Sequence, residues 1–376
     1  MSRWGYDVAI IGAGIVGAAC ADELSRRGQR VCLVDTDFPG AGATMAAMGH
    51  VVVMDDSEAQ FALTRYSQGL WQQLRPELPR EAEYNPCGTI WIAADEEEMR
   101  EVVRKNSYYG SRGITTRVLN SQELRTCEPG LRAGLAGGLL VPGDVVVHPP
   151  SATKCFIERA LKRGADSRIG TVVRIGDHTI ELATGQQITA HVIVNAAGSN
   201  AADLTPGVDI RKRKGHLAIT DQRPGFLSHQ LVELGYLKSA HTVASDSVAF
   251  NVQPRPGGQI LVGSSRQYGS ETGEVEDQIL ARMLRRAQEY MPGLAEMTIV
   301  RTWTGLRAAT QDKLPLIGPW PQDESVFLAT GHEGLGITTS LGTAQLIADQ
   351  ITGATSPIPV EPYLPSRNLK EPSHAG

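Results

Sequence analysis

The sequence predicts an α/β protein in which a domain with a parallel sheet is interrupted by an α+β domain built on a mostly antiparallel sheet. Three observations lead to this prediction. Residues 6–35 read as strand, glycine loop, helix and strand, the usual start of a parallel sheet. Residues 192–198 and 328–338 are strand-like apolar runs that end in small residues. Between them, residues 208–302 contain the alternating runs typical of antiparallel strands.

The length and composition are those of a globular chain with two domains, or three. The chain has 376 residues, enough to bury a sizeable core. Hydrophobic residues make up 41% of it and charged residues 20%, which argues against disorder over most of its length. The formal net charge is −5, so no overall positive field attracts phosphate backbones or anionic lipid, and we do not expect nucleic acid as a partner.

The cysteines predict neither a disulfide framework nor a metal site. All five lack a C-x-x-C partner and a nearby histidine at zinc-ligand spacing, so we expect reduced thiols, a cytoplasmic location and no bound metal. The apolar stretch at residues 8–21 covers 14 residues, fewer than the roughly 20 that a membrane span needs. No transmembrane segment is therefore expected.

The first strand and its glycine loop carry the strongest signal. Residues 6–11 are apolar and end at a G-x-G-x-x-G loop, which predicts a buried strand followed by a helix over about 14–27. In such loops Gly12 makes the turn, Gly14 lets the backbone approach a pyrophosphate, and Gly17 lets helix and strand pack closely. The residues expected to hold a dinucleotide here are Gly12, Gly14, Ile15, Val16 and Gly17.

The next strand completes a dinucleotide-binding unit. It ends at Asp35, which lies 18 residues after Gly17 and can accept hydrogen bonds from an adenosine ribose, with Thr36 beside it. A carboxylate at this position favours a free ribose 2′-hydroxyl over a 2′-phosphate. Strand, loop, helix, strand and acid in register make dinucleotide binding the expected role of this unit.

A second small-residue stretch, at residues 40–49, favours a flavin over a nicotinamide as the bound cofactor. With this stretch the chain resembles the D-amino-acid oxidase-like flavoproteins, the family of glycine oxidase, sarcosine oxidase and the D-amino-acid dehydrogenases. The resemblance implies noncovalently bound FAD, with His50 near the flavin ring as a proton partner. It also implies cofactor contacts from Ala43, Thr44, Ala46, Ala47, Met48 and Gly49.

The carboxyl-terminal third carries further family patterns. Residues 303–318 resemble the family's W-x-G-x-R and D-x-x-P-x-I-G segment, in which an arginine at the position of Arg307 binds the substrate carboxylate through a two-pronged contact near the cofactor. Residues 331–338 resemble the turn that faces flavin N1 and O2, where His332 and Glu333 would contact substrate or else anchor the loop. Other cofactor contacts implied by the resemblance are Val172, Ala197, Gly198, Gly334, Leu335, Gly336, Ile337 and Thr338.

Two positions depart from the family pattern. Glycine oxidase-like sequences place an arginine where Gly334 sits, which implies that a second carboxylate contact is missing here. Asn251 stands where relatives often carry a tyrosine over the substrate, which implies a more polar substrate contact there or none.

The resemblance also implies a domain division: an FAD-binding Rossmann-like domain at 1–82, 146–207 and 303–354, a substrate-binding domain at 83–145 and 208–302, and a proline-rich tail at 355–376. Because the tail lacks periodicity, we expect it to be loosely held.

The resemblance implies oxidation of the Cα–N bond of a small amino or imino acid by hydride transfer to the flavin. Residues 45–68 and the loop around His332 look most like bacterial D-hydroxyproline dehydrogenases, which act on cis-4-hydroxy-D-proline in hydroxyproline degradation. D-Proline or another D-amino acid, glycine or sarcosine, and a flavin subunit of a multi-subunit dehydrogenase stay open as alternatives. So does a noncatalytic scaffold role.

The electron acceptor is expected to be a quinone or dye in preference to oxygen. The position of the oxygen-activating lysine of sarcosine oxidases falls close to Leu261 here, an apolar residue. Glycine oxidases manage without that lysine, so an oxidase stays open. Monomer and homo-oligomer are both compatible with the sequence.

Overall fold

The computed structural model describes residues 4–235 and 246–368, and the chain divides into two compact units. Unit 1 comprises Met1–Ala82, His148–Lys212 and Arg307–Gly376, and unit 2 comprises Glu83–Val147 and Arg213–Leu306. This differs from the division expected from the sequence in four places. Residues 208–212 and the expected tail from residue 355 belong to unit 1, and residues 146–147 and 303–306 belong to unit 2.

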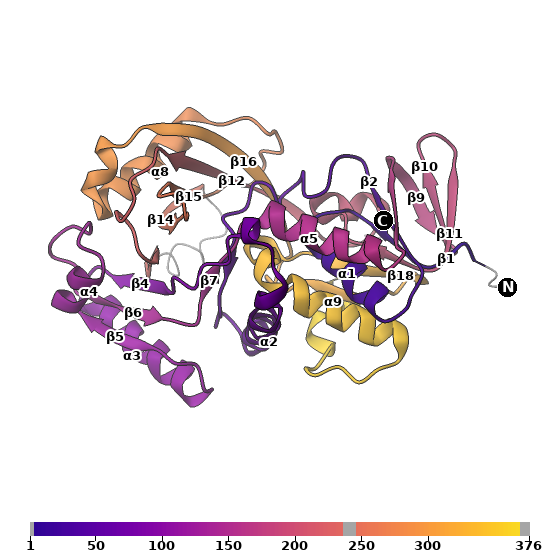
Figure 1. Cartoon of the computed structure of the whole chain (residues 1–376), viewed down its shortest axis with the longest axis horizontal. Coiled ribbons are helices and arrows are strands. Elements are labelled where there is room, and N and C mark those ends of the chain that lie inside the picture. The colour runs from indigo at the N-terminus through magenta and orange to yellow at the C-terminus, as the bar shows by residue number, and fades with distance from the viewer. Residues whose placement is uncertain (1–3, 236–245, 369–376) are drawn as a thin grey trace, which may run out of the picture. The chain divides into compact units, whose positions relative to one another are not determined.

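Unit 1 is built on a largely parallel sheet (Figure 1). Its strand order is β17 (Leu316–Trp320), β18 (Asp323–Thr330), β11 (Gln187–Asn195), β1 (Tyr6–Ile11), β2 (Val31–Asp35), β8 (Asp166–Ile169). β17 is antiparallel to β18, whereas the other pairs along this path are parallel. The hairpin of β9 (Val172–Gly176) and β10 (Thr179–Leu182) extends the sheet from β11. The short strand β3 (His50–Val51) also belongs to this unit.

Helices pack beside this sheet, with α1 in contact with both α5 and α9, and α2 in contact with α9 (Figure 1). They are α1 (Ile15–Arg26), α2 (Glu58–Leu74), α5 (Pro149–Lys162), α6 (Ala201–Leu204) and α9 (Gly336–Thr352). α1 ends where Gly28, at φ +81°, donates its N–H to the Ser25 carbonyl, a conformation that favours glycine. One-turn 3-10 helices are at Arg75–Glu77, Arg80–Ala82, Gly198–Asn200, Glu333–Leu335, Glu361–Tyr363 and Pro365–Asn368.

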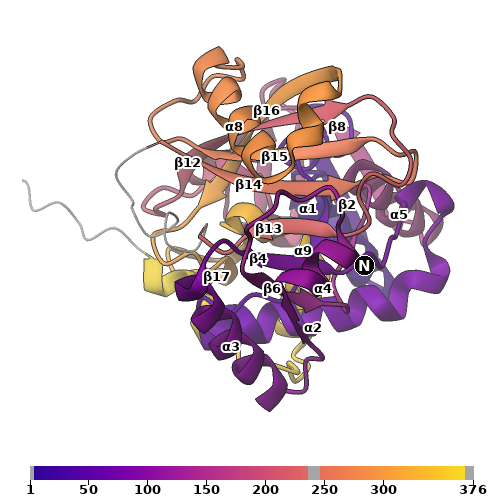
Figure 2. The ribbon, with the colours of Figure 1, turned by 90° about the vertical axis from the view of Figure 1, so that its left-hand side faces the viewer.

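Unit 2 is built on a mostly antiparallel sheet (Figure 2). Its order is β16 (Ile299–Ala309), β12 (Arg211–Thr220), β15 (Ile260–Arg266), β14 (Ser247–Pro254), β13 (Gln230–Glu233), β4 (Thr89–Ala93), β6 (Gly137–Val141), β5 (Arg117–Asn120). Only β13 and β4 are parallel among the pairs with a described register. The short strand β7 (Val145–Val146) also belongs to this unit.

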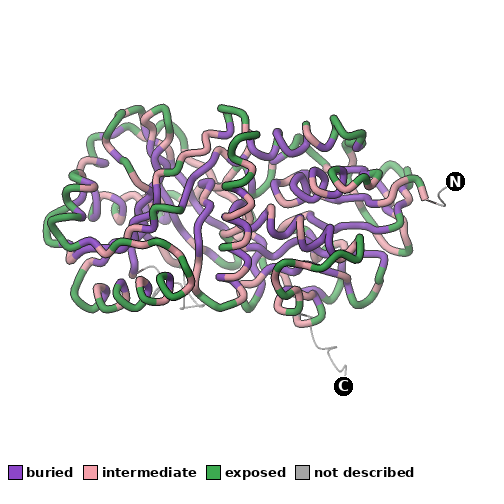
Figure 3. The backbone as a smooth tube through the Cα atoms, turned by 60° about the horizontal axis from the view of Figure 1, so that its bottom comes forward, coloured by how far each residue is buried: buried purple, intermediate pink, exposed green. Residues whose placement is uncertain are grey.

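One face of the unit 2 sheet is apolar and forms the core of that unit. α8 (Asp277–Tyr290) packs on β14 and β15. The strands consist largely of buried residues, whereas the outer side of α3 (Glu96–Ser111) is largely exposed (Figure 3). The remaining helices of the unit are α4 (Ser121–Cys127) and a 3-10 segment at Pro292–Glu296. The core includes Ile90, Ile92, Leu231, Phe250, Val252, Val262, Met283 and Tyr290.

The expectation of a loosely held tail was wrong for residues 361–367. Tyr363 is 1% exposed, and its hydroxyl donates to the Ala59 carbonyl at 2.7 Å. The Arg367 guanidinium pairs with Asp312 at 2.7 Å and donates to the Leu314 carbonyl. A buried aromatic ring and a bonded guanidinium hold this segment without any periodic pattern. Residues 369–376 of the tail lie outside the described part.

Candidate functional site

The cofactor residues expected from the sequence gather at one edge of the unit 1 sheet. Gly12 follows β1, Asp35 ends β2, Gly198 lies just beyond β11, and the turn at residues 331–335 follows β18. Because these strands are parallel, their carboxyl ends meet at the same edge, where open α/β sheets bind ligands. Two hydrogen bonds join these ends: the Gly12 N–H donates to the Val34 carbonyl at 2.8 Å, and the Thr330 side-chain hydroxyl donates to the Gly198 carbonyl at 2.9 Å.

The three glycines of the first loop differ in what surrounds them. A Cβ on Gly17 would lie 1.9 Å from the Gly12 carbonyl oxygen, so only glycine lets α1 pack this close to β1. Gly12 has φ +100°, which favours glycine at the turn. A Cβ on Gly14 would meet only the Thr44 hydroxyl, at 3.3 Å. The fold therefore requires Gly12 and Gly17, whereas at Gly14 a Cβ would meet one side-chain oxygen and no backbone atom.

Asp35 is tied to the glycine loop. Its carboxylate accepts hydrogen bonds from the Ala13 N–H at 2.5 Å and from the Asp37 N–H at 3.2 Å. Its backbone carbonyl accepts from the Gly170 N–H at 2.8 Å, which brings the start of β9, and Val172, to this edge. Thr36 is exposed beside Asp35. The contacts fix the orientation of the carboxylate, and an oxygen that accepts one hydrogen bond can accept a second.

The segment at residues 40–49 folds back onto the start of α1. The Gly40 N–H donates to the Ala13 carbonyl at 2.9 Å. The Thr44 hydroxyl oxygen accepts from the Ile15 N–H at 3.0 Å, so this side chain caps a helix whose own cap position, Gly14, has no side chain. The hydroxyl can still donate its proton to an anion. Ala43 is exposed, whereas Met48 and Gly49 are buried.

His50, Arg307 and Thr338 come together in unit 1. The Thr338 hydroxyl, in the first turn of α9, donates to the His50 carbonyl at 2.8 Å. Burial first, and then the positive charge of Arg307, lower the pKa of the His50 imidazole from about 6.5 to about 4. Its Nε2 atom is buried and has no hydrogen-bond partner in the described part of the chain. His50 is therefore uncharged at neutral pH and has a free nitrogen.

The imidazole of His332 lies in the core of unit 1. Its Nε2 is 2.9 Å from the Thr343 hydroxyl of α9, and burial lowers its pKa to about 3. These contacts favour the loop-anchoring role that the sequence left as an alternative. Glu333 follows at φ +50°, an uncommon conformation for a residue other than glycine, and is half-buried.

Asn251 lies in unit 2, on β14, opposite Val232 of β13 and Gly263 of β15. Its Oδ1 atom is buried and has no partner among the described residues. Gln230 and Gln253 are buried polar side chains of the same sheet, and unlike Asn251 they were not expected from the sequence. The alternation of polar, apolar and polar residues at 251–253 is the signal that could have identified them.

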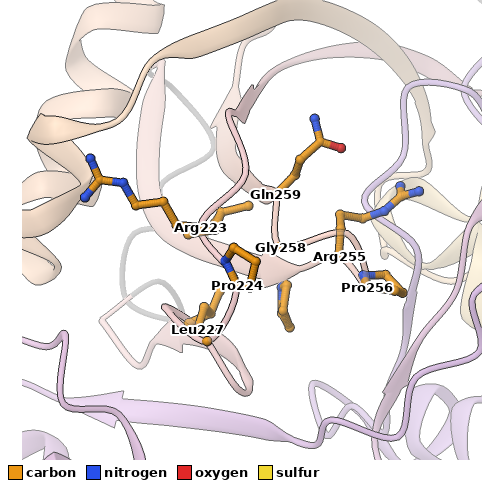
Figure 4. A pocket seen from close by; sticks show the side chains of 10 residues that line it. Arg223, Pro224, Leu227, Arg255, Pro256, Gly258 and Gln259 are labelled. Carbon is orange, nitrogen blue, oxygen red and sulfur yellow. The ribbon is translucent and has the colours of Figure 1, made fainter.

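A small pocket lies elsewhere in unit 2, at the turn between β14 and β15 (Figure 4). Arg223 and Arg255 line it, but their guanidinium groups are engaged by Glu296 and Glu83 respectively. None of the expected site residues lines it. No helix of the described part is both long and apolar enough to cross a membrane.

Residues 7–350 match the model of the family described as DAO, FAD dependent oxidoreductase. The chain belongs to this family. Its FAD cofactor and its oxidoreductase class, both expected from the sequence, are thereby confirmed. The fold class is confirmed as well, since the chain matches the crystal structure of glycine oxidase from Geobacillus kaustophilus with a TM-score of 0.88 at 26% identity, over 97% of this chain and 99% of that one.

Curated relatives match along almost their whole length. The hydrogen cyanide synthase subunit HcnC of Pseudomonas aeruginosa is 27% identical over 98% of this chain and 97% of its own. The Geobacillus kaustophilus glycine oxidase is 28% identical over 97% of both. A D-amino acid dehydrogenase of Methylobacterium nodulans is 26% identical over 96% of this chain and 99% of its own.

The residues of this DAO-family chain fit FAD. Gly14, which has no side chain, caps the amino terminus of α1, where backbone N–H groups and the helix dipole favour a pyrophosphate. Asp35 presents a fixed carboxylate to a ribose, and the free Nε2 of His50 lies among the buried polar atoms of the unit. The start of α1 suits the pyrophosphate of FAD, Asp35 suits its ribose, and the His50 nitrogen suits its polar flavin ring.

Proposed function

We propose that this protein is an FAD-dependent dehydrogenase that oxidises the Cα–N bond of a small D-amino or imino acid. The observation that carries the proposal is that a guanidinium, Arg307, lies close enough to the buried His50 imidazole of unit 1 for its charge to lower the pKa of that imidazole. A fixed cation beside a neutral hydrogen-bonding group suits a substrate with a carboxylate and an amine. Relatives named glycine oxidase and D-amino acid dehydrogenase support the same substrate class.

The protein's part in this reaction is mainly to bind and orient. Bound FAD would supply the hydride acceptor. Arg307 would hold the substrate carboxylate with its planar fork and so direct the Cα–H bond. With its pKa near 4, His50 is a poor base at neutral pH, so it serves as a hydrogen-bond partner through Nε2. The substrate ammonium would lose a proton to water, and the lone pair of the neutral amine would then form the C=N bond as the hydrogen on Cα leaves as hydride. No side chain is required to remove that hydrogen as a proton.

We assign the FAD contacts to the residues gathered at the carboxyl edge of the unit 1 sheet. The glycine loop and Thr44 would bind the pyrophosphate, Asp35 the ribose, and the first turn of α9 the flavin. Glu333 stays a proposed substrate contact, whereas His332 is proposed to hold the loop. Asn251 is proposed as a polar substrate contact.

Our preferred substrate is cis-4-hydroxy-D-proline, oxidised to the pyrroline carboxylate in a cytoplasmic pathway of hydroxyproline degradation, with a quinone or dye as acceptor. The resemblance of residues 45–68 and the polar Asn251 support it. A glycine, sarcosine or D-amino-acid oxidase that uses oxygen is the second candidate, favoured by the glycine oxidase relatives. A flavin subunit of a larger dehydrogenase is the third, favoured by the HcnC relative.

A dye-linked assay with purified protein tests the proposal. D-Proline and cis-4-hydroxy-D-proline are compared with pyrrolidine, which has the C–N bond but no carboxylate. The proposal predicts reduction of the dye by an amino or imino acid and none by pyrrolidine. Equal rates with and without the carboxylate would refute the role of Arg307, and no rate with any of a broad set of amino acids would refute the substrate class.

A further inference from the structure

The turn before α9 and the first turn of α9 differ in how far they are covered by the rest of unit 1. Residues 333–336 are half-buried or exposed, whereas residues 337–340 are buried. An α-helix leaves its first four N–H groups without partners in the helix, and its dipole makes this end partly positive. Gly336 is the first residue of α9 and is not fully covered, so its N–H is a donor that a ligand can reach.

Trp71 holds the start of α9 from its buried side. It lies in the last turn of α2 and is 0% exposed. Its indole N–H donates to the Ile337 carbonyl at 3.2 Å and to the Thr338 carbonyl at 3.1 Å. An indole has a single donor, so both contacts depend on this one N–H. One side chain of α2 therefore fixes two consecutive carbonyls in the first turn of α9.

The packing around this contact leaves the indole little freedom. α2 and α9 approach closely beside it, since a Cβ on Gly342 would lie 2.2 Å from the Ser67 hydroxyl oxygen. Ser67 precedes Trp71 by about one turn of α2 and so lies on the same face of that helix. On α5, the buried ring of Phe156 lies 5.7 Å from the Trp71 ring, centre to centre. The donor is thus held in place by two neighbouring helices.

A chain of hydrogen bonds leads from Trp71 to the accessible turn. The Thr338 carbonyl, which accepts from the indole, shares its peptide group with the Thr339 N–H. In an α-helix that N–H donates to the carbonyl four residues earlier, here Leu335, and the Thr339 hydroxyl donates to the same carbonyl at 2.8 Å. The Leu335 carbonyl shares its peptide group with the Gly336 N–H. Hydrogen bonds in such a chain polarise one another, so the Gly336 N–H becomes a stronger donor.

We propose that Trp71 is a positioning residue for the flavin, which fixes and polarises the start of α9 and so stabilises the negative charge that arrives with a hydride. This inference rests on the proposed function, in which the first turn of α9 binds the flavin. A hydride carries two electrons and one proton, so a neutral ring that accepts it acquires one negative charge. Donors that are already in place stabilise that charge without reorganisation, which raises the reduction potential of the flavin.

The test uses Trp71→Phe, which keeps an aromatic ring in the core and removes the indole N–H. Trp320→Phe is the matched control. Trp320 is also a buried tryptophan of unit 1, 7% exposed, and its indole N–H has no partner in the described part of the chain. The midpoint potential of the bound flavin is measured against a reference dye during reduction by xanthine and xanthine oxidase, which requires no amino-acid substrate.

We expect Trp71→Phe to weaken the binding of reduced FAD relative to oxidised FAD about threefold, which lowers the midpoint potential by about 14 mV for a two-electron couple. Trp320→Phe should keep the wild-type potential. An unchanged potential in Trp71→Phe would overturn the proposal. An equal fall in both variants would also overturn it, because the cause would then be loosened packing in unit 1 and not the lost hydrogen bonds.

A second pair of variants tests the same chain of hydrogen bonds with Trp71 in place. Thr339→Val keeps the shape of the side chain and removes its hydrogen bond to the Leu335 carbonyl, so the midpoint potential should again fall. Thr352→Val is the control, because the Thr352 hydroxyl makes the same kind of bond, to the Ala348 carbonyl at 2.8 Å, at the other end of α9. If Thr339→Val keeps the wild-type potential, as Thr352→Val should, the proposal is contradicted.

Failure of the proposed function gives a different result. In that case no amino or imino acid reduces the wild-type flavin, whereas the midpoint potentials of the wild type and the variants are still measured and compared. A fall in potential in Trp71→Phe alone would then support the role of Trp71 even though the substrate class was wrong.

Discussion

The hydroxyl of Thr338 donates to the backbone carbonyl of His50 at 2.8 Å and accepts from the Val52 N–H at 3.3 Å. One buried side chain thus joins the first turn of α9 to β3, although the two segments are far apart in the sequence. Trp71 strengthens the same junction, since its indole N–H donates to the Thr338 carbonyl at 3.1 Å. The position of His50 therefore depends on the start of α9.

The first prediction concerns this junction. Thr338→Val keeps the shape of the side chain but leaves the His50 carbonyl without its donor, so we expect the free energy of unfolding to fall by about 1–2 kcal/mol and FAD affinity to fall with it. Urea unfolding and FAD titration of the apoprotein measure both. Thr338→Ser keeps the hydroxyl and should stay close to the wild type. If Thr338→Val behaves like Thr338→Ser, the hydroxyl does not hold the site.

The second prediction separates two glycines of one loop. Gly14→Val should lose FAD while the apoprotein stays folded, because the added side chain would block the approach to the start of α1 and its Cβ would meet only the Thr44 hydroxyl, at 3.3 Å. Gly17→Ala should destabilise the apoprotein, because its Cβ would lie 1.9 Å from a backbone oxygen. Flavin absorbance per chain and thermal unfolding of the apoprotein test both. A Gly14→Val protein with full FAD content would contradict the placement of the pyrophosphate.

The third prediction concerns Arg307. Arg307→Lys keeps the charge but loses the planar fork, so KM for the substrate should rise about tenfold or more while FAD content stays unchanged. Steady-state kinetics and flavin absorbance measure the two quantities. An unchanged KM would mean that another group binds the carboxylate.

The fourth prediction is a pH dependence of stability. The pKa of His332 is about 3 in the folded protein and near 6.5 when unfolded, so between these values the unfolded chain binds more protons. The contribution of His332 to the free energy of unfolding is therefore complete above pH 6.5. It falls as the pH is lowered, by about 3 kcal/mol between pH 7 and pH 4. His332→Asn should flatten the dependence of the unfolding free energy on pH by about one proton. The same slope in wild type and variant would show that His332 does not titrate on unfolding.

The fifth prediction concerns the acceptor. Leu261 lies close to the position where the resemblance would place an oxygen-activating lysine, so reduced enzyme should pass electrons to a dye or quinone faster than to oxygen. Stopped-flow reoxidation compares the rates directly. Comparable rates would favour the oxidase alternative.

The sequence predicted unit 1 well because its signals are local. The glycine loop, the apolar strand before it and Asp35 at the end of the next strand are all read from spacing alone, and the structure brings them to one edge as parallel strands require. Thr44 was selected as well, but its hydrogen bond to the Ile15 N–H depends on how residues 40–49 fold back, which no local pattern specifies.

Other features depend on contacts between distant segments. The burial of Tyr363 against Ala59 makes a packed segment out of a stretch without periodicity. The core position of His332 depends on Thr343, so its side chain could not be assigned to substrate or loop from the sequence. Gln230 and Gln253 become neighbours only through the register of β13 with β14, which the sequence does not specify.

An anaerobic titration of the purified protein tests the central claim most directly. Flavin absorbance is followed as cis-4-hydroxy-D-proline, D-proline, sarcosine and glycine are added in parallel. We predict rapid bleaching by the D-imino acids, fastest with the hydroxylated one. A visible flavin that no amino or imino acid bleaches would contradict the claim that this protein oxidises the Cα–N bond of such a substrate.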